Sequence, residues 1–424
     1  MLFLVFLVSL VQTQAFKAWV ITDTHFDKDY SVGSYSYCPQ MDCCHSNSQP
    51  SKNQKIETSG PCGHYNCYPP LNVSQTAFDY IYAHKDESQL VFWMMDTLPC
   101  TELQQTKEKN VYHIQTQAQE IQKRLPGFKV FPTPGNHDYF THSNWDYPPT
   151  SEWMLNIMAD LFEPWLSERS LEMFRKGGYY SELIESNIRL VSMNFAYMDM
   201  YGVHCGDYAT NDPAGMVQWF NQTLQLAQKA NEKIVIITHE CIGLKNTGIV
   251  DLAPKFNADF DELMQSYSDV IITHLCGHSH YDSFKIYPTY DTAHYHCIVN
   301  PAMTTKLSLD PRFRLMEFSD KSVVGWKQYV LDIEKCNVEN KLDWKFEYET
   351  QSEYGVTGWD TQNIKTFLTN LERNETLFNI WKMHFGEHGG HVFNGNLKKD
   401  FLCSSIALTE QTFIDCLSNY PLKK

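Results

Sequence analysis

A turn rich in polar groups, placed directly after an apolar run, most constrains how this chain can fold. The run 129–133 has the length and composition of a strand, and Gly135, Asn136, His137 and Asp138 follow it almost at once. Such a turn places an amide oxygen, an imidazole and a carboxylate at one edge of a sheet, where open α/β sheets hold ligands. Taken alone, the turn is equally explained by ordinary Gly-Asn turn chemistry.

Four other apolar runs end in the same kinds of side chain. These runs and the residues that follow them are 18–22 with Asp23 and His25, 90–95 with Asp96, 233–238 with His239, and 269–276 with Gly277, His278 and His280. Because the carboxyl ends of parallel strands meet at one edge of a sheet, we expect these groups to lie together. A lone histidine at a strand end is usually a packed core residue, but seven ligand-type groups in order make coincidence improbable.

Helical patterns separate the apolar runs. We predict helices over 74–84, 103–125 and 151–175, and a further helix that begins at Pro213 with Asp212 as its cap. The alternation of strand, polar loop and helix predicts a layered α/β fold with a central sheet. Strands at 314–318 and 326–331 precede a mostly helical end, so we predict a core over 16–334 and a C-terminal helical subdomain over 335–424.

The charge balance argues against one class of partner. The 424 residues carry a net charge of −16 and contain no basic block, so a groove for a nucleic acid polymer is not expected. A small phosphate ester bound through metal ions needs no basic surface.

The amino terminus suggests an exported protein. Residues 1–15 are interpreted as a signal peptide cleaved after Ala15, with a frayed first strand as the alternative. Three Asn-x-Ser/Thr sequons, at Asn72, Asn221 and Asn374, and 13 cysteines agree with export. We therefore expect a secreted or lysosome-like location, glycosylation at these asparagines and no transmembrane segment, with peripheral membrane contact as an open alternative.

The cysteines allow two interpretations. Five of them lie between residues 38 and 67, where they form either a zinc knuckle or, as a secreted chain favours, disulfides. Cys403 and Cys416 are expected to clamp the helical end. Because 13 is odd, at least one thiol stays free or pairs between chains. Cys241 is interpreted as a buried inert thiol, and Cys276 as a packing residue.

The polar groups at the strand ends suit a metal site. Carboxylate, imidazole and amide oxygen are ligands that zinc, iron and manganese accept, and their number suffices for two ions. Two ions that share one carboxylate form a clamp that activates water and neutralises a phosphoryl group. Asp96 is the natural shared carboxylate because it is alone at its strand end.

These motifs resemble those of the calcineurin-like metallophosphoesterase superfamily and, more narrowly, those of the saposin-free branch of the acid sphingomyelinase-like phosphodiesterases. The resemblance is carried by Asp23-x-His25, Asp96, Gly135-Asn136-His137-Asp138, His239, Gly277-His278-x-His280, the segment 175–181 and the C-terminal cysteines. It implies a calcineurin-like domain over 16–334, built as a layered sandwich of mixed β-sheets flanked by helices. It also implies hydrolysis of phosphodiester or phosphoanhydride bonds by metal-activated hydroxide attack.

The resemblance further implies a role for each site residue. Two divalent ions, expected to be Zn²⁺, would be held by Asp23, His25 and His280 on one side, by Asn136, His239 and His278 on the other, and by Asp96 between them. His137 would contact the substrate phosphate or protonate the leaving group. We expect a monomer that acts on a small phosphate ester such as a nucleotide, or on a phospholipid such as sphingomyelin.

Two positions depart from the family pattern. Met95 stands where the family has glycine, and the substrate-contacting position four residues after Asp96 is Cys100 instead of histidine. Losing one positioned acid or base costs about 10²- to 10⁴-fold in rate. The alternative function is therefore a catalytically impaired homologue that keeps its metals and acts as a binding protein. A purple-acid-type phosphomonoesterase would need tyrosine at position 99, which is Pro99.

Overall fold

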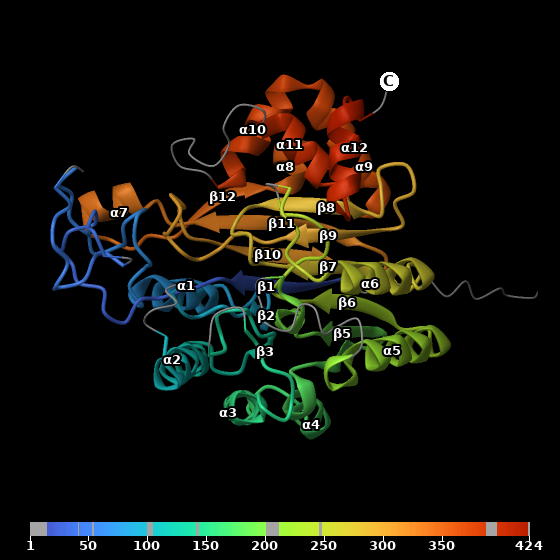
Figure 1. Ribbon diagram of the computed structural model, residues 1–424, viewed down its shortest axis with the longest axis horizontal. Helices are drawn as coiled ribbons and strands as arrows, with labels where there is room; N and C mark the ends of the chain where they lie inside the picture. Colours follow the sequence, from blue (N-terminus) through green and yellow to red (C-terminus); the bar gives the residue numbers. More distant parts are fainter. Residues whose placement is uncertain are drawn as a thin grey trace, which may run out of the picture.

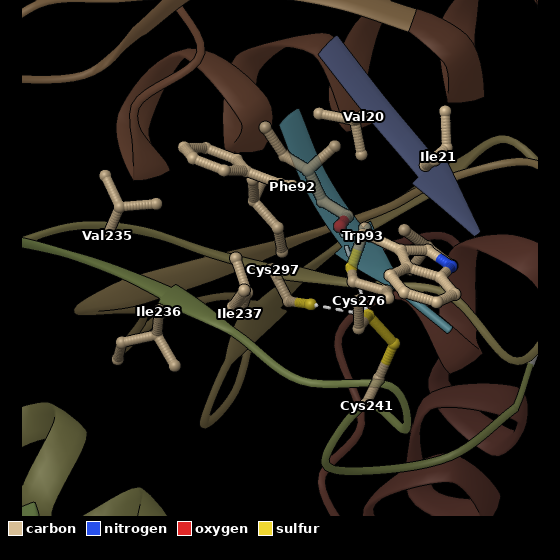
Figure 2. Packing of buried hydrophobic residues seen from close by; sticks show 14 of the residues in the cluster. Val20, Ile21, Phe92, Trp93, Val235, Ile236, Ile237, Cys241, Cys276 and Cys297 are labelled. Carbon is tan, nitrogen blue, oxygen red and sulfur yellow. Dashed lines mark hydrogen bonds between the residues drawn. A yellow bond between two sulfur atoms is a disulfide. The ribbon is translucent and has the colours of Figure 1, made fainter. Parts of the chain in front are cut away.

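Two β-sheets form the centre of the molecule. The computed structural model describes residues 15–40, 42–52, 55–99, 105–140, 144–200, 212–245, 248–386 and 397–422. Within these ranges, twelve strands form two six-stranded sheets, and helices lie around them (Figure 1). Figure 2 shows apolar side chains of one sheet, such as Val20 and Phe92, near Val235 and Ile237 of the other, so the sheets share one core.

The first sheet is mixed, with the order β12-β11-β10-β1-β2-β3. Its strands are β1 (Phe16–Thr22), β2 (Leu90–Met94), β3 (Lys129–Pro132), β10 (Arg312–Phe318), β11 (Val323–Val330) and β12 (Lys345–Glu349). β1, β2 and β3 are parallel, whereas β10, β11 and β12 continue the sheet in antiparallel order from β1. The carboxyl ends of the first three strands therefore meet at one edge.

The second sheet has the order β4-β5-β6-β7-β9-β8. Its strands are β4 (Tyr180–Glu185), β5 (Ile188–Ser192), β6 (Lys233–Ile237), β7 (Ile271–Cys276), β8 (Ser283–Tyr287) and β9 (Tyr295–Val299). The four inner strands are parallel, and β4 and β8 are antiparallel edges. The inner strands β6 and β7 are almost continuously apolar, as expected for parallel strands that are covered on both faces.

The helices fall into two groups by their place in the chain. The helices that precede β8 are α1 (Asn72–Ala83), α2 (Lys107–Arg124), α3 (Glu152–Phe162), α4 (Glu168–Gly177), α5 (Met216–Ala230) and α6 (Pro254–Ser266). The later helices are α7 (Ile333–Glu339), α8 (Thr350–Tyr354), α9 (Thr361–Arg373), α10 (Glu375–Phe385), α11 (Leu397–Ser404) and α12 (Glu410–Asn419). α9 packs on β8 and β9, and α8 packs on β11 and β12, so the C-terminal helices lie over strands of both sheets.

The predicted layered α/β fold with a helical C-terminal region is confirmed, with several local differences. The helix predicted over 151–175 is split into α3 and α4, because Pro164 lies between them and the side chain of Ser167 caps α4 by accepting from Ser170 N. Asp212 is not the N-cap residue of the next helix, because α5 begins at Met216 after a short 3₁₀ turn and Gly215 takes the N-cap position. The Asp212 carboxylate nevertheless accepts from Val217 N and Gln218 N in the first turn. Within 335–424, β12 also supplies an edge strand of the first sheet.

Disulfides, and not a zinc knuckle, fasten the cysteine-rich segment. The pairs Cys38–Cys43 and Cys44–Cys67 lie within it, and Cys62–Cys336 ties it to α7 across a sequence separation of 274. Cys403–Cys416 joins α11 to α12 as predicted. None of the helices in the described part of the chain has the length and apolarity needed to cross a membrane. The predicted signal peptide lies outside the described residues, apart from Ala15.

Candidate metal centre

The ends of five parallel strands bring the predicted ligands together. β1, β2 and β3 lead to Asp23 and His25, to Asp96, and to Asn136, whereas β6 and β7 lead to His239 and to His278 and His280. All of these side chains except those of His278 and His280 are buried, and those two are half-buried. The site is thus contributed by both sheets.

Asp23, His25 and His280 form one group of possible ligands. His280 Nε2 lies 3.2 Å from Asp23 Oδ1 and 3.2 Å from His25 Nε2, and His25 Nε2 lies 3.6 Å from Asp23 Oδ1. Three donor atoms this close can hold one ion between them.

Asp96, His239 and His278 form a second group beside the first. Asp96 Oδ2 lies 3.3 Å from His239 Nε2, and Asn136 Oδ1 lies 3.1 Å from His278 Nδ1. Asn136 therefore lies beside this group.

Asp96 connects the two groups. Its Oδ2 atom lies 3.2 Å from His25 Nε2 in the first group and 3.3 Å from His239 Nε2 in the second. The position of this carboxylate, within reach of ligands on both sides, is the one that a bridging ligand needs.

Hydrogen bonds orient two of the imidazoles. The Nδ1 atom of His239 lies 2.9 Å from the Met94 carbonyl oxygen, and Nδ1 of His25 lies against the Leu98 carbonyl oxygen. A carbonyl can only accept, so each Nδ1 carries a proton and each Nε2 is the ring nitrogen that faces the carboxylates.

Five predicted ligands have left-handed backbone conformations. The φ angles are 51° for Asp23, 40° for His25, 62° for Asp96, 63° for His278 and 68° for His280. This region disfavours residues with a Cβ atom, and such strain persists where the surroundings impose it, most often at functional sites. The strand-end loops are therefore shaped to aim these side chains.

Two glycines permit the close approach of these loops. A Cβ atom at Gly135 would lie 2.8 Å from Asp96 Cβ and 2.9 Å from Asp96 N. A Cβ atom at Gly277 would lie 2.2 Å from Thr22 Oγ1 and 2.6 Å from Asp23 Oδ2. Only glycine fits at either position without displacing a ligand-bearing loop.

Asp138 holds two of the loops, a role that its place in the sequence motif did not reveal. Its Oδ2 accepts from Asp96 N and Gly135 N at 2.8 Å each, and its Oδ1 accepts from Thr97 N at 2.9 Å and Thr97 Oγ1 at 2.7 Å. This buried carboxylate thereby fixes the backbone on both sides of the bridging position.

His137 lies at the border of the centre and is buried. Its backbone N–H donates to Asp96 Oδ1 at 2.8 Å, its carbonyl accepts from Asn110 Nδ2 at 3.1 Å, and its Nε2 lies 3.9 Å from Asp96 Oδ2. Both backbone contacts fix the imidazole next to the ligands.

Asp251 was not anticipated at all. Its Oδ1 atom lies 3.7 Å from His278 Nε2 and 2.6 Å from Lys245 Nζ. Asp251 belongs to none of the motifs, so no local sequence pattern pointed to it.

The electrostatics of the centre suit cations. Burial alone would raise the pKa of Asp23, but the imidazoles of His239 and His280 hold it well below its ordinary value. The same balance of burial against His137 and His239 holds the pKa of Asp96 well below its ordinary value. Both carboxylates are therefore ionised at neutral and mildly acidic pH.

The donor atoms themselves fit divalent metals. Asp23 Oδ1 and His239 Nε2 are fully buried, and neither makes a hydrogen bond. Buried polar atoms are rarely left in this way unless another ligand satisfies them. Oxygen and imidazole donors are those that borderline divalent ions accept.

The two departures from the family pattern have different outcomes. Met95, which stands where the family has glycine, is buried and lies outside the left-handed region, whereas the next residue, Asp96, lies within it. The Met95 carbonyl accepts from Asp23 N at 2.8 Å, so this residue helps to join two strand ends. Cys100 lies outside the described residues.

Two interpretations of cysteines near the centre were wrong. Cys241 is no inert thiol, and Cys276 does more than pack, because the two form a disulfide. The bridge joins the loop after His239 to the strand that leads to His278.

The three predicted glycosylation sites differ in exposure. Asn374 is exposed at the start of α10, whereas Asn72 in α1 and Asn221 in α5 are half-buried. Glycosylation at these asparagines remains a prediction.

The fold and the site together define a class, the metal-dependent phosphoesterases. The fold is layered α/β, and acids, histidines and an asparagine gather at the carboxyl ends of its parallel strands. The chain belongs to the calcineurin-like phosphoesterase family, which matches residues 16–282. Residues 291–423 match the acid sphingomyelin phosphodiesterase C-terminal region. The chain is therefore a phosphoesterase of the acid sphingomyelinase-like type, in a family that uses divalent metals, and the resemblance inferred from the motifs is confirmed.

Relatives match most of this chain. It is 28% identical over 371 residues to sphingomyelin phosphodiesterase A of Dictyostelium discoideum. This alignment covers 85% of this chain but only 61% of the relative. It is 27% identical over 424 residues to human cyclic GMP-AMP phosphodiesterase SMPDL3A, covering 96% of this chain and 90% of the relative. Human acid sphingomyelinase-like phosphodiesterase 3b is 27% identical over 428 residues, with coverages of 95% and 90%.

Proposed function

We propose that this protein is a phosphodiesterase with two divalent metal ions, expected to be Zn²⁺, that cleaves phosphodiester or phosphoanhydride bonds in nucleotide-like small molecules. The observation that carries the proposal is the position of Asp96 Oδ2, 3.2 Å from His25 Nε2 in one donor group and 3.3 Å from His239 Nε2 in the other. A carboxylate shared by two donor groups is the arrangement of a two-metal hydrolase.

Each side chain has a task in this proposal. Asp23, His25 and His280 would hold one ion, Asn136, His239 and His278 would hold the other, and Asp96 would be shared between them. When bound, the two ions supply an activated water and positive charge beside the phosphoryl group.

His137 is the proposed proton donor to the leaving group. Its imidazole lies at the border of the ligands, with the ring centroids of His137 and His25 5.3 Å apart. Its backbone is hydrogen-bonded to Asp96 and Asn110, so the ring is positioned before substrate arrives. A donor placed in this way contributes about 10²- to 10⁴-fold to the rate.

The relatives carry names from both substrate classes. The human relative named for cyclic GMP-AMP aligns over 90% of its length, and the Dictyostelium relatives named for sphingomyelin or sphingomyelinase align over 61% and 92% of theirs. Both classes are therefore compared directly in the test below. Sphingomyelin is the second substrate class, and it would require peripheral contact with a membrane.

We further propose that the protein is secreted or lysosomal, glycosylated and monomeric. The five disulfides support an oxidising compartment, because such bonds are rare in reducing ones. The exposed Asn374 is the most accessible of the three acceptor sites.

The test compares three substrates on one sample of purified, glycosylated protein. Hydrolysis of bis-p-nitrophenyl phosphate, ATP and sphingomyelin is measured in parallel, with metal content determined on the same sample and Asp96→Asn as the control. We expect turnover that Asp96→Asn abolishes, about two metals per chain, and faster hydrolysis of ATP than of sphingomyelin.

One outcome would replace the proposal by the impaired binding protein. A sample that carries its metals but turns over none of the substrates would contradict the assigned activity. In that event Cys100→His, which restores the histidine of the family pattern, should produce a large gain in turnover.

A further inference from the structure

Three cysteines lie together behind the metal centre, and the proposed reaction uses none of them. Cys241 follows β6 in the loop that carries His239, Cys276 is the last residue of β7, and Cys297 lies in β9. Their sulfur atoms all lie within 4.8 Å of one another. Figure 2 shows the yellow disulfide bond between Cys241 and Cys276, with Cys297 directed at Cys276 from the neighbouring strand.

The free thiol is in contact with the disulfide. Cys297 Sγ lies 3.0 Å from Cys276 Sγ, and Cys297 is the one cysteine in the described part of the chain that is outside a disulfide. The β7–β9 ladder fixes this contact, because His274 pairs with Cys297 and Cys276 pairs with Val299. Cys276 and Cys297 are both fully buried, so external thiols have poor access to them.

We propose that Cys241, Cys276 and Cys297 form a thiol–disulfide exchange site, in which the disulfide moves between Cys241–Cys276 and Cys276–Cys297. The Cys297 thiol gives up its proton and its sulfur bonds to Cys276 Sγ. The Cys276–Cys241 bond breaks, and the Cys241 sulfur leaves with the electron pair and takes up a proton. One disulfide and one thiol exist before and after the step, so no oxidant or reductant is needed.

A buried amine next to Cys297 supports the step. Lys285 pairs with Cys297 across the β8–β9 ladder, and its ammonium donates to the Leu244 carbonyl in the loop that carries Cys241. Burial raises the pKa of the Cys297 thiol, and Lys285 opposes that rise. Burial lowers the pKa of Lys285 to about 8, which makes its neutral amine available as a proton acceptor.

The exchange has a consequence for the centre that rests on the proposed function. In the Cys241–Cys276 form, the bridge joins a cysteine two residues after His239 to a cysteine two residues before His278. The ring centroids of these two histidines are 5.2 Å apart. In the Cys276–Cys297 form, the bridge joins two strands that the ladder already holds, and the His239 loop loses its covalent tie. We therefore expect weaker metal binding in the second form.

The exchange is tested by mapping disulfides without reduction. Trypsin places the three cysteines on separate peptides, 234–245, 256–285 and 286–306. Free thiols are blocked in acid-quenched, denatured protein before digestion, and cross-linked peptides are identified by mass spectrometry. Wild-type protein should yield both the 234–245/256–285 and the 256–285/286–306 products after incubation near pH 8.

Two variants make the result decisive. Cys241→Ser should yield 256–285 linked to 286–306, whereas Cys297→Ser should yield only the link between 234–245 and 256–285. If Cys276 and Cys297 are both recovered as blocked free thiols in Cys241→Ser, and the wild type never yields the second product, the exchange site does not exist.

Metal titration then tests the consequence separately. Cys297→Ser should bind metal as the wild type does, and Cys241→Ser should bind it about 10- to 100-fold more weakly, the usual cost of losing support for a ligand. The peptide map involves neither substrate nor metal, so the exchange can succeed where the proposed function fails, and the reverse.

Discussion

The two halves of the metal centre are built in different ways. The half from the first sheet carries Asp96 on a loop that hydrogen bonds hold, four of them accepted by Asp138. The half from the second sheet carries His239 and His278 on segments that the Cys241–Cys276 disulfide joins.

Direct backbone hydrogen bonds join the strand-end loops in both halves. Asp23 N donates to the Met95 carbonyl at 2.8 Å in the first half, and Gly277 N donates to the His239 carbonyl at 2.9 Å in the second. The first half adds the Asp138 carboxylate to these bonds, whereas the second adds a covalent bridge. The first half therefore depends on a buried charge, and the second on the state of a sulfur bond.

The largest effect should follow removal of the disulfide in the second half. Cys241→Ala together with Cys276→Ala opens a loop with a sequence separation of 35, which should cost about 4 kcal/mol in the free energy of unfolding, because the unfolded chain regains loop entropy. Urea denaturation measures this loss. Cys38→Ala with Cys43→Ala is the matched control, since its separation of 5 predicts a loss of about 2 kcal/mol and unchanged metal affinity.

The next largest effect should follow Asp138→Asn in the first half. The amide keeps one acceptor oxygen but turns an NH₂ group toward backbone N–H donors, which leaves buried donors unpaired. We expect a loss of about 3 kcal/mol in the free energy of unfolding, measured in urea. Thr97→Val, which removes only the Oγ1 bond, should cost about 1 kcal/mol. Equal losses in Asp138→Asn and Thr97→Val would show that the stabilisation by Asp138 is not shared among its four hydrogen bonds.

The sequence was sufficient for one part of this comparison. Asp23, Asp96 and His239 could be found because each follows an apolar run, and the edge where parallel strands end was expected to gather them. The split between α3 and α4 was missed by the prediction of one helix over 151–175, although Pro164 and the capping Ser167 both signal a new helix.

The supports of the ligands could not be predicted in this way. Whether Cys241 meets Cys276 or Cys297 depends on the order of β6, β7 and β9 in the sheet, which no local pattern encodes. Asp251 reaches His278 only because its loop folds back across the strand ends, and its sequence neighbours carry no trace of that contact. The predicted ligands could be recognised from the residue types that follow each strand. The residues that support them depend on how distant segments pack together, which the local sequence does not reveal.

A smaller effect should follow loss of the carboxylate behind His278. Asp251→Asn removes the charge 3.7 Å from His278 Nε2, and it should lower metal affinity about 10- to 100-fold while leaving the fold intact. Isothermal titration with Zn²⁺ measures the affinity, and urea denaturation checks the fold. Lys245→Met removes the other partner of Asp251 but keeps the carboxylate, so it should change the affinity less. If both variants bind Zn²⁺ as the wild type does, the second half depends on its disulfide alone.

The smallest expected effect concerns a cluster around His384, which lies outside both halves of the metal centre. This cluster should affect the stability of the fold but not metal binding. His384 in α10 contacts Glu353 at 2.9 Å and Glu347 at 3.5 Å. Burial would lower the pKa of His384, but these carboxylates raise it above its ordinary value of 6.5. Burial would raise the pKa of Glu347, but Arg312 holds it well below its ordinary value of 4.5.

The sign of the pH dependence follows from these two shifts. A histidine with a raised pKa adds stability that is full below 6.5 and is lost as the pH rises through the pKa of the folded state. A glutamate with a lowered pKa adds stability that is full above 4.5 and is lost as the pH falls. The cluster should therefore stabilise the protein most between pH 4.5 and pH 6.5.

The free energy of unfolding of the wild type, measured in urea, should exceed that of His384→Gln by about 1 kcal/mol near the middle of this window, and by less above about pH 8. Metal affinity at fixed pH should be the same in both proteins, because His384 supports the C-terminal helices and not the ligands of either half. If His384→Gln lowers metal affinity as well as stability, then α10 does support the metal centre, and the two halves are not independent of the C-terminal helices.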